Sequence, residues 1–385
     1  MTSASSHSLK EQDFHIPIAF AFDKNYLIAA SACIYSLLES IAKANKKIRY
    51  TLYALVVGLD EEDKAKLHQI AEPFKEFAAL EVKDIEPFLD TIPNPFDEDF
   101  TKRFSKMVLV KYFLADLFPQ YSKMVWSDVD VIFCNEFSAD FLNIKEDDEN
   151  YFYGVYDKIY PYEGFFYCNL TCQRKNQFCK KILETMHTKI DKEPQLTEFC
   201  RSKIAPLKIE YCIFPHYYSL SEEHLRGVVN AIYHNTIKQA LREPIVIQYD
   251  SHPYFQIKPW TYPFGLKADL WLNALAKTPF MSDWSYLITG GGEIGSEKWH
   301  YYHSIIAYHY YFPLWKTEEQ IAHDAFKTFL NHYSLHIHEI PKNARRRLFK
   351  YCILIPLKSL ISKTLKILGL HGIVKKILLK LLKKS

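Results

Sequence analysis

Two aspartates, Asp128 and Asp130, stand one residue apart within the apolar segment Lys123–Phe133. This run of β-branched and aromatic residues predicts a buried strand, in which side chains at i and i+2 point to the same side. Two carboxylates that converge at the edge of a core repel each other and are costly to desolvate, and a divalent cation removes both penalties. The pair therefore indicates a site for Mg²⁺ or Mn²⁺ with a diphosphate. The alternative is a solvated turn, because Asp-x-Asp is a common sequence.

Polar residues also follow an earlier apolar segment, residues 16–22. Asp23 and Asn25 come directly after it, and residues 27–40 have the apolar spacing of a helix. A strand that leads through a polar turn into a helix opens an α/β unit, and open α/β sheets bind ligands at the carboxyl ends of their strands. Asp23 and Asn25 are thus placed to reach a ribose or a base. The alternative is an Asx turn that caps the helix.

The first 135 residues alternate between strand and helix patterns. Strands are predicted at residues 16–22, 49–57, 79–85 and 123–133, and helices at 27–40, 60–77 and 106–118. Asp60 is the expected N-cap of the second helix, and Pro119 ends the third. Further strands are expected at 151–156 and 245–249, and helices at 174–188 and 269–277. This order predicts an α/β fold in which helices flank a nucleotide-binding sheet.

Residues beyond the strand at 245–249 carry further chemistry. His252 stands at the end of this strand, where a histidine can ligate the metal that the aspartates hold. Lys258 is placed by the rigid Pro259 and can neutralise a phosphate leaving group. The alternatives are a surface-loop histidine and, for Trp260, a core anchor.

The composition is that of a globular protein. Of the 385 residues, 48% are hydrophobic and 16% are aromatic, which argues against a disordered chain. The eight cysteines form no C-x-x-C pair, so we expect neither a zinc site nor a disulfide framework. Free cysteines of this kind indicate a reducing compartment. The first 14 residues are polar, and no window holds about 18 uninterrupted apolar residues. We therefore expect no signal peptide and no membrane-spanning helix.

The segment 341–385 has a composition of its own. It holds 13 Lys or Arg residues and no Asp or Glu, whereas the rest of the chain holds 35 basic and 45 acidic residues. Leu and Ile recur in it at steps of three and four with Lys between them, which predicts a pair of basic amphipathic helices. Such helices lie on anionic membranes. The alternative is a helix that packs its Leu face on the body; nucleic acid is not expected as a partner, because the apolar face has no role against phosphates.

Taken together, these features resemble the retaining glycosyltransferases of family 8, bacterial lipopolysaccharide and lipooligosaccharide galactosyl- and glucosyltransferases with a GT-A fold. The matching sequences are FAFDKNY at 20–26, the Asp-x-Asp segment at 123–133, Asn169-Leu170-x-x-x-Arg174, and His252-x5-Lys258-Pro259-Trp260. The similarity runs from residue 16 to 282. It implies a GT-A catalytic domain over 14–285, a helical, aromatic extension over 286–340 and the basic tail over 341–385.

The resemblance implies a UDP-sugar donor, most often UDP-galactose or UDP-glucose, and a bound Mn²⁺ or Mg²⁺. The implied metal ligands are Asp128, Asp130 and His252, and the implied contacts to uracil and ribose are Asp23, Asn25 and Tyr26. Lys258 would contact the diphosphate. The acceptor would be a glycan or lipid-linked saccharide, and the tail would hold a cytoplasmic enzyme at the inner face of the cytoplasmic membrane.

Three positions depart from the family pattern. Lys111 stands where the family has an arginine, and we retain it as a nucleotide contact. The family's Asn-Ala-Gly beside the sugar is Tyr162-Glu163-Gly164 here, and its later Asp-Gln-Asp is not legible around 195–198. The donor sugar therefore stays open. A diphosphate oxygen can take the acceptor proton; a double displacement would instead need a carboxylate beneath the sugar, for which Glu163 and Glu198 are the candidates.

Two other classes of protein remain as alternatives. A nucleotidyltransferase also uses a carboxylate pair, but it needs basic contacts to a triphosphate near the first turn, where only Lys24 stands. The other alternative is a catalytically inactive relative that binds a membrane surface.

Overall fold

The computed structural model describes residues 14–95, 106–145, 147–156, 161–186, 200–249, 251–252, 255–256, 258–260 and 266–284. The chain forms two units, Met1–Asp250 with Lys258–Gly292, and Ser251–Ile257 with Glu293–Ser385. In the second unit, β10 (Ser251–His252) pairs antiparallel with β11 (Phe255–Gln256). The predicted extension at 286–340, the tail at 341–385 and Glu198 lie outside the described residues.

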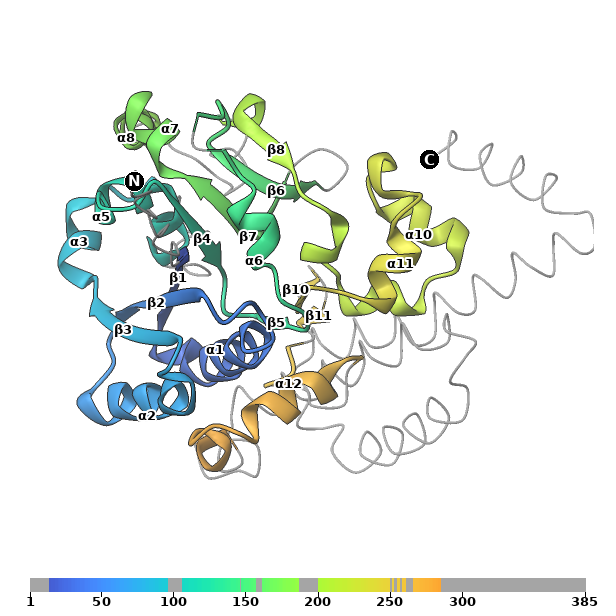
Figure 1. The fold of residues 1–385 in the computed structure, drawn as a ribbon, viewed down its shortest axis with the longest axis horizontal. Helices are drawn as coiled ribbons and strands as arrows, with labels where there is room; N and C mark the ends of the chain where they lie inside the picture. The colour runs from blue at the N-terminus through green and yellow to red at the C-terminus, as the bar shows by residue number, and fades with distance from the viewer. Residues whose placement is uncertain are drawn as a thin grey trace, which may run out of the picture. The chain divides into compact units, whose positions relative to one another are not determined.

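A seven-stranded sheet forms the centre of the first unit, with the strand order β3-β2-β1-β4-β7-β6-β8 (Figure 1). Its strands are β1 (Phe14–Asp23), β2 (Ile48–Val57), β3 (Ala78–Asp84), β4 (Lys123–Ser127), β6 (Phe152–Tyr156), β7 (Pro161–Asn169) and β8 (Ile204–Pro206). The strands from β3 to β4 are parallel to their neighbours, whereas β7 runs antiparallel to β4 and β6. The sheet is therefore mixed, and the predicted α/β class is confirmed.

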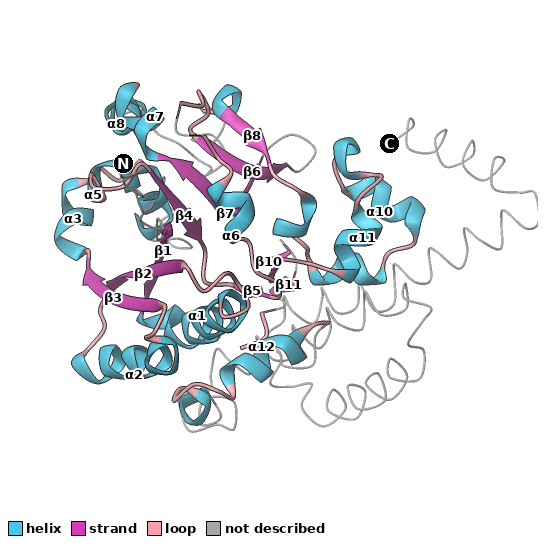
Figure 2. Cartoon of the chain, viewed as in Figure 1, coloured by secondary structure: helices cyan, strands magenta, loops and turns pink. Residues whose placement is uncertain are grey.

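Helices cover both faces of this sheet (Figure 2). Because side chains alternate along a strand, Ile18 and Phe20 of β1 enter one hydrophobic cluster and Ala19 enters another. The first cluster includes residues of α1 (Leu27–Ile41), α2 (Glu61–Ala71) and α12 (Ala268–Leu275). The second includes residues of the 3₁₀ helix η3 (Lys106–Tyr112) with α5 (Leu114–Leu117), α7 (Leu170–Lys175) and α8 (Phe178–Met186).

The remaining described helices are short. They are η1 (Lys24–Tyr26), η2 (Glu72–Phe74), α3 (Glu86–Thr91), α6 (Ser138–Leu142), η4 (Arg201–Lys203), η5 (Ile209–Tyr211), η6 (Pro215–Ser219), α10 (Glu222–Val228), η7 (Ala231–Tyr233) and α11 (Ile237–Arg242).

The strand predicted at 123–133 is interrupted at the two aspartates. It consists of β4 and β5 (Val131–Phe133), and β5 leaves the main sheet to pair antiparallel with β9 (Val246–Gln248). Backbone hydrogen bonds fix this switch, since the Asp128 N–H donates to Gly164 O at 2.8 Å and the Tyr249 N–H donates to Asp130 O at 2.8 Å. The aspartates therefore lie on a connection between two ladders.

Three predicted helices are also divided. The helix expected at 106–118 is η3 followed by α5, and the one expected at 60–77 ends at Ala71 before a 3₁₀ turn that contains Pro73. The helix expected at 174–188 overlaps the end of α7 and all of α8, which are separated where Gln177 adopts φ 53°. A positive φ interrupts a right-handed helix, and the sequence carried no glycine to indicate it.

Candidate active site

Asp130 and Lys258 form the centre of the candidate site. The Lys258 ammonium contacts Asp130 Oδ2 at 2.5 Å and also donates to the backbone carbonyl of Tyr249. Both side chains are largely buried, at 9% exposure for Lys258 and 18% for Asp130. Buried ions need a partner of opposite charge, and the connection before β5 and the segment at 258–260 supply one for each other. The two residues that the sequence assigned to the metal and the diphosphate are thus in direct contact.

Asp128 is held at the end of β4. Its carboxylate Oδ1 accepts a hydrogen bond from Trp126 Nε1 at 3.1 Å. Its backbone carbonyl accepts one from the Ser127 hydroxyl at 2.8 Å, and its N–H is bound to β7 at Gly164. Backbone and side chain are therefore both fixed, and the carboxylate direction is set before any ligand binds.

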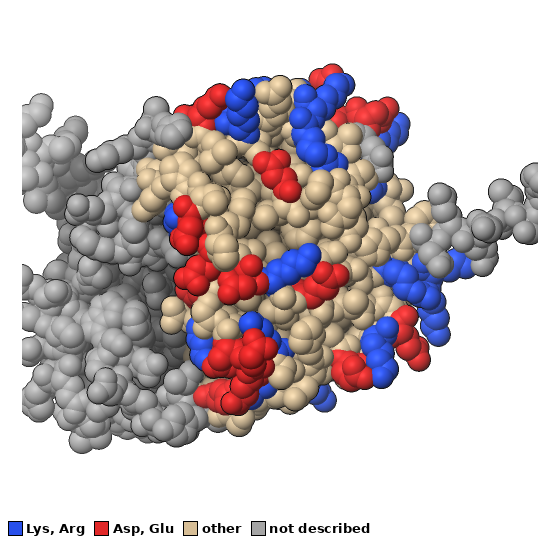
Figure 3. Space-filling view, turned by 90° about the vertical axis from the view of Figure 1, so that its left-hand side faces the viewer, with Lys and Arg blue, Asp and Glu red and all other residues tan. Residues whose placement is uncertain are grey.

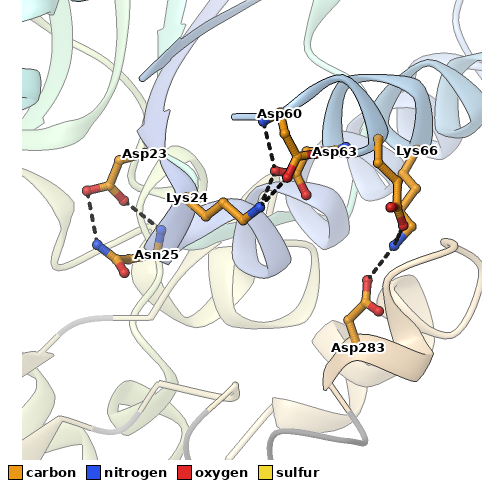
Figure 4. Close-up of polar contacts among 8 residues, drawn as sticks. Asp23, Lys24, Asn25, Asp60, Asp63, Lys66 and Asp283 are labelled. Atoms are coloured by element: carbon orange, nitrogen blue, oxygen red, sulfur yellow. Dashed lines mark hydrogen bonds and ion pairs between the residues drawn. The ribbon is translucent and has the colours of Figure 1, made fainter. Parts of the chain in front are cut away.

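The turn after β1 is organised by its own side chains (Figure 4). Asp23 Oδ1 accepts from the Asn25 N–H at 3.0 Å and from the Tyr26 N–H at 3.3 Å, and Asn25 Nδ2 donates to Asp23 Oδ2 at 3.3 Å. This is the Asx turn that the sequence left as the alternative for these residues. The Asn25 side chain and the exposed Tyr26 stay at the carboxyl edge of the sheet, so the cap and a ligand contact are compatible.

Lys24 is directed away from this turn toward α2. Its ammonium contacts Asp60 at 2.8 Å and Asp63 at 2.7 Å, at the capping box of that helix (Figure 4). The neighbouring carboxylates raise the pKa of Lys24, and Lys24 in turn lowers the pKa of Asp60 to about 2. The single basic residue of the first turn is thus engaged by the helix, which argues against the triphosphate contacts of a nucleotidyltransferase.

Tyr26 connects the first turn with the other candidate residues. Its ring lies edge-on to Trp260, with 6.0 Å between the ring centroids. Tyr26 is 42% exposed, and desolvation of its covered part raises its pKa, an effect that Lys258 opposes. The negative charges of Asp130, Asp128 and Asp23 raise the pKa further. The ring contact with Trp260 places Tyr26 against the segment at 258–260, which also carries Lys258.

Lys111 and Glu163 form a second buried ion pair. The Lys111 ammonium lies 2.7 Å from Glu163 Oε2, and the Tyr112 hydroxyl donates to the same oxygen at 2.9 Å. Lys111 is 2% exposed and Glu163 is 14% exposed. Two of the positions that depart from the family pattern therefore form an ion pair, in which the positive charge of Lys111 balances the negative charge of Glu163. Their roles toward nucleotide and sugar stay predictions.

The carboxylates are a suitable donor set for a hard divalent cation. Asp130 Oδ1 is buried and has no hydrogen-bond partner among the described residues, which leaves one oxygen lone-pair set for a ligand. His252 lies in β10 of the second unit, and its side chain is outside what the structure describes. Within the described ranges no three His, Cys, Asp or Glu residues cluster as a metal site. The third ligand is therefore still a prediction.

Sequence reasoning did not assign several residues of this site. Trp126 fixes Asp128 through its indole N–H, and the backbone carbonyl of Tyr249 binds Lys258. Gln248 lies against Gly164, where an added Cβ would stand 2.4 Å from its Nε2. A contact made by a backbone carbonyl or by packing can be formed by many residue types, so the sequence does not indicate it. Only the position of Trp126, two residues before Asp128, was a usable indication.

Solved structures identify the fold. The apo structure of the bifunctional glycosyltransferase WbbM superposes with a TM-score of 0.58 at 16% identity, covering 71% of this chain and 52% of WbbM. The galactosyltransferase LgtC, solved with donor and acceptor sugar analogs, superposes with a TM-score of 0.50 at 14% identity, covering 69% of this chain and 96% of LgtC. The chain spans about half of the WbbM chain. The fold is that of the GT-A glycosyltransferases, as the sequence predicted.

Comparison of the sequence with family models identifies the family. The model of glycosyl transferase family 8 matches residues 17–263, well over half of the chain. The chain belongs to this family and is a glycosyltransferase. No curated protein sequence matches it. None of the described helices is long and apolar enough to span a membrane.

Proposed function

We propose that this chain is a metal-dependent, retaining hexosyltransferase that moves galactose or glucose from a UDP-sugar to a glycan or lipid-linked saccharide. The observation that carries the proposal is the contact of Lys258 with Asp130, the second aspartate of the Asp-x-Asp sequence. The lysine supplies a positive charge for a diphosphate, and the Asp-x-Asp carboxylates supply oxygen ligands for its cation.

Each residue then has a role in binding or catalysis. Asp128 and Asp130, with His252, would hold Mn²⁺ or Mg²⁺, which stabilises negative charge on the departing diphosphate when it is bound. Lys258 would bind the same diphosphate as a point charge. Asp23, Asn25 and Tyr26 would contact uracil and ribose. Trp126 would keep Asp128 aimed at the cation without touching the substrate itself.

The sugar would be transferred with retention at its anomeric carbon. The acceptor hydroxyl attacks from the side that UDP leaves, and a diphosphate oxygen takes its proton, so that no protein base is needed. Lys111 and Glu163 would line the nucleotide and sugar end of the site. Glu163 would act as the nucleophile only in a double displacement, and its engagement by Lys111 and Tyr112 would then hold it ionised and in place.

The tail at 341–385 would bind an anionic membrane surface at the inner face of the cytoplasmic membrane, where a lipid-linked acceptor is found. On the face of the molecule drawn in Figure 3, acidic and basic side chains are interspersed. We assign membrane attraction to the tail because its 13 basic residues have no acidic neighbours in the segment.

The test is release of UDP without acceptor, measured for UDP-galactose, UDP-glucose and their N-acetyl forms with and without Mn²⁺. We expect one donor to be hydrolysed only with metal, and Asp128→Asn to lower the rate by about 10²–10³-fold because a charge-stabilising group is lost. Asp283→Asn removes one carboxylate that is paired with Lys66 and serves as the matched control. If no donor is hydrolysed but UDP still binds, the enzyme either requires its acceptor for turnover or is an inactive relative. If UDP does not bind at all, the donor assignment is wrong.

A further inference from the structure

The contact between Lys258 and Asp130 places a cation where the proposed metal would bind. The ammonium lies between a carboxylate oxygen of Asp130 and the carbonyl oxygen of Tyr249, both of which are oxygen donors of the kind that Mg²⁺ and Mn²⁺ take. The Tyr249 N–H donates to Asp130 O at 2.8 Å, so the two oxygens belong to one hydrogen-bonded pair of segments. The protein's own lysine therefore neutralises part of the negative charge at Asp130.

A divalent cation would enter beside this ammonium. Asp130 Oδ1 is buried and has no hydrogen-bond partner within the described part of the chain, and Lys258 holds the other oxygen of the same carboxylate. Two cations on one largely buried carboxylate repel each other strongly, because the surroundings screen charge poorly. The repulsion is relieved when an anionic diphosphate enters and the ammonium moves to it.

We infer that Lys258 is a placeholder cation that couples metal binding to diphosphate binding. It weakens the metal site while the nucleotide is absent and transfers its charge from Asp130 to the diphosphate when the nucleotide binds. The inference rests on the proposed function, in which both ligands meet at this site. Metal alone and UDP alone should each bind weakly, and each should strengthen the other by the same factor, since linkage is reciprocal.

The first test measures Mn²⁺ binding to the full chain without nucleotide, from the EPR signal of free Mn²⁺. Lys258→Gln keeps a donor for the Tyr249 carbonyl but removes the charge, so it should bind Mn²⁺ alone about tenfold more tightly than the wild type, a size usual for coupling. Lys258→Arg keeps the charge and should stay within about threefold of the wild type. Lys66→Gln, which removes a lysine paired with Glu62 and Asp283, controls for net charge.

The second test leaves Lys258 in place and measures UDP binding by calorimetry in the presence of a chelator. Asp130→Asn frees the ammonium for the diphosphate, whereas Asp128→Asn removes an equal charge from the same tripeptide and keeps the Lys258–Asp130 pair. Asp130→Asn should therefore bind metal-free UDP more tightly than Asp128→Asn does, by about tenfold. This comparison also answers the question if Lys258→Gln does not fold, which thermal unfolding would reveal.

The outcomes separate the inference from the proposed function. Tighter Mn²⁺ binding by Lys258→Gln, or the difference between the two aspartate variants, supports the placeholder role. If the wild type binds Mn²⁺ and UDP together but Lys258→Gln binds Mn²⁺ alone no more tightly, the inference is wrong and the proposed function stands. If the wild type binds no Mn²⁺–UDP, both are wrong.

Discussion

At the scale of single residues, the site depends on charges that are buried in pairs. Lys258 with Asp130 and Lys111 with Glu163 are each formed by segments far apart in the sequence. Burying one charge alone is costly, so each partner stabilises the other where neither would be stable by itself. The pairs therefore fix the positions of η3, β7 and the segment at 258–260 as well as supplying chemistry.

The Lys111–Glu163 pair gives a prediction about stability. Lys111→Met leaves the Glu163 carboxylate buried without its cation and should lower the free energy of unfolding by about 3–5 kcal/mol. The double variant Lys111→Met with Glu163→Leu removes both charges and should be less destabilised than the sum of the single variants. Urea unfolding of the four proteins measures the coupling. Additive effects would show that the two charges do not stabilise each other.

At the scale of secondary-structure elements, the break between β4 and β5 creates the site. A continuous strand would have paired all of 123–133 with one neighbour, whereas here β4 pairs with β7 and β5 pairs with β9. Asp128 is bound at the first ladder and Asp130 at the second. The two carboxylates are thus positioned by different parts of the core, which makes their separation depend on how the ladders meet.

Two glycines on β6 and β7 test this arrangement through opposite effects. A Cβ at Gly154 would stand 2.7 Å from the ring of Phe166, which is 2% exposed and cannot move, so Gly154→Ala should cost about 1–3 kcal/mol of stability. The atoms nearest to a Cβ at Gly164 belong to the end of the Gln248 side chain, which can change rotamer for about 0.5–1.5 kcal/mol.

The functional cost should have the reverse order. Gly164 O binds the Asp128 N–H, and Gln248 is the last residue of β9 before Tyr249, so Gly164→Ala should weaken Mn²⁺–UDP binding more than Gly154→Ala does. Thermal unfolding and calorimetry on both variants measure the two effects. If Gly164→Ala weakened Mn²⁺–UDP binding no more than Gly154→Ala does, the assignment of Gly164 to the site would be wrong.

At the scale of the whole molecule, the sequence predicted what depends on local pattern. Alternating apolar segments around Asp23 and the Asp-x-Asp pair were sufficient for the α/β class, because strand ends and turns carry recognisable residues. The sequence did not predict the bend at Asp128, since its cause is pairing with Gly164 and Tyr249, which are 36 and 119 residues away from Asp128 and Asp130. The pairing of Lys111 with Glu163 was missed for the same reason.

The division of the chain into an acidic body and a basic segment predicts how the enzyme meets its acceptor. Neutralising three tail lysines by Lys375→Gln, Lys376→Gln and Lys380→Gln should weaken binding to anionic vesicles by about 10²-fold, since each basic residue near such a surface contributes about 1 kcal/mol. Sedimentation with phosphatidylglycerol vesicles measures this, and the wild type should also release from them as salt is raised.

A matched variant separates the tail from net charge. Lys64→Gln, Lys66→Gln and Lys75→Gln remove three lysines that form ion pairs with acidic residues on or beside α2, and they should leave vesicle binding unchanged. UDP release should be the same in both triple variants, because none of the six lysines is assigned to the site. Equal loss of vesicle binding in the two variants would mean that the whole protein's charge attracts it to the membrane, and that the tail has no special part.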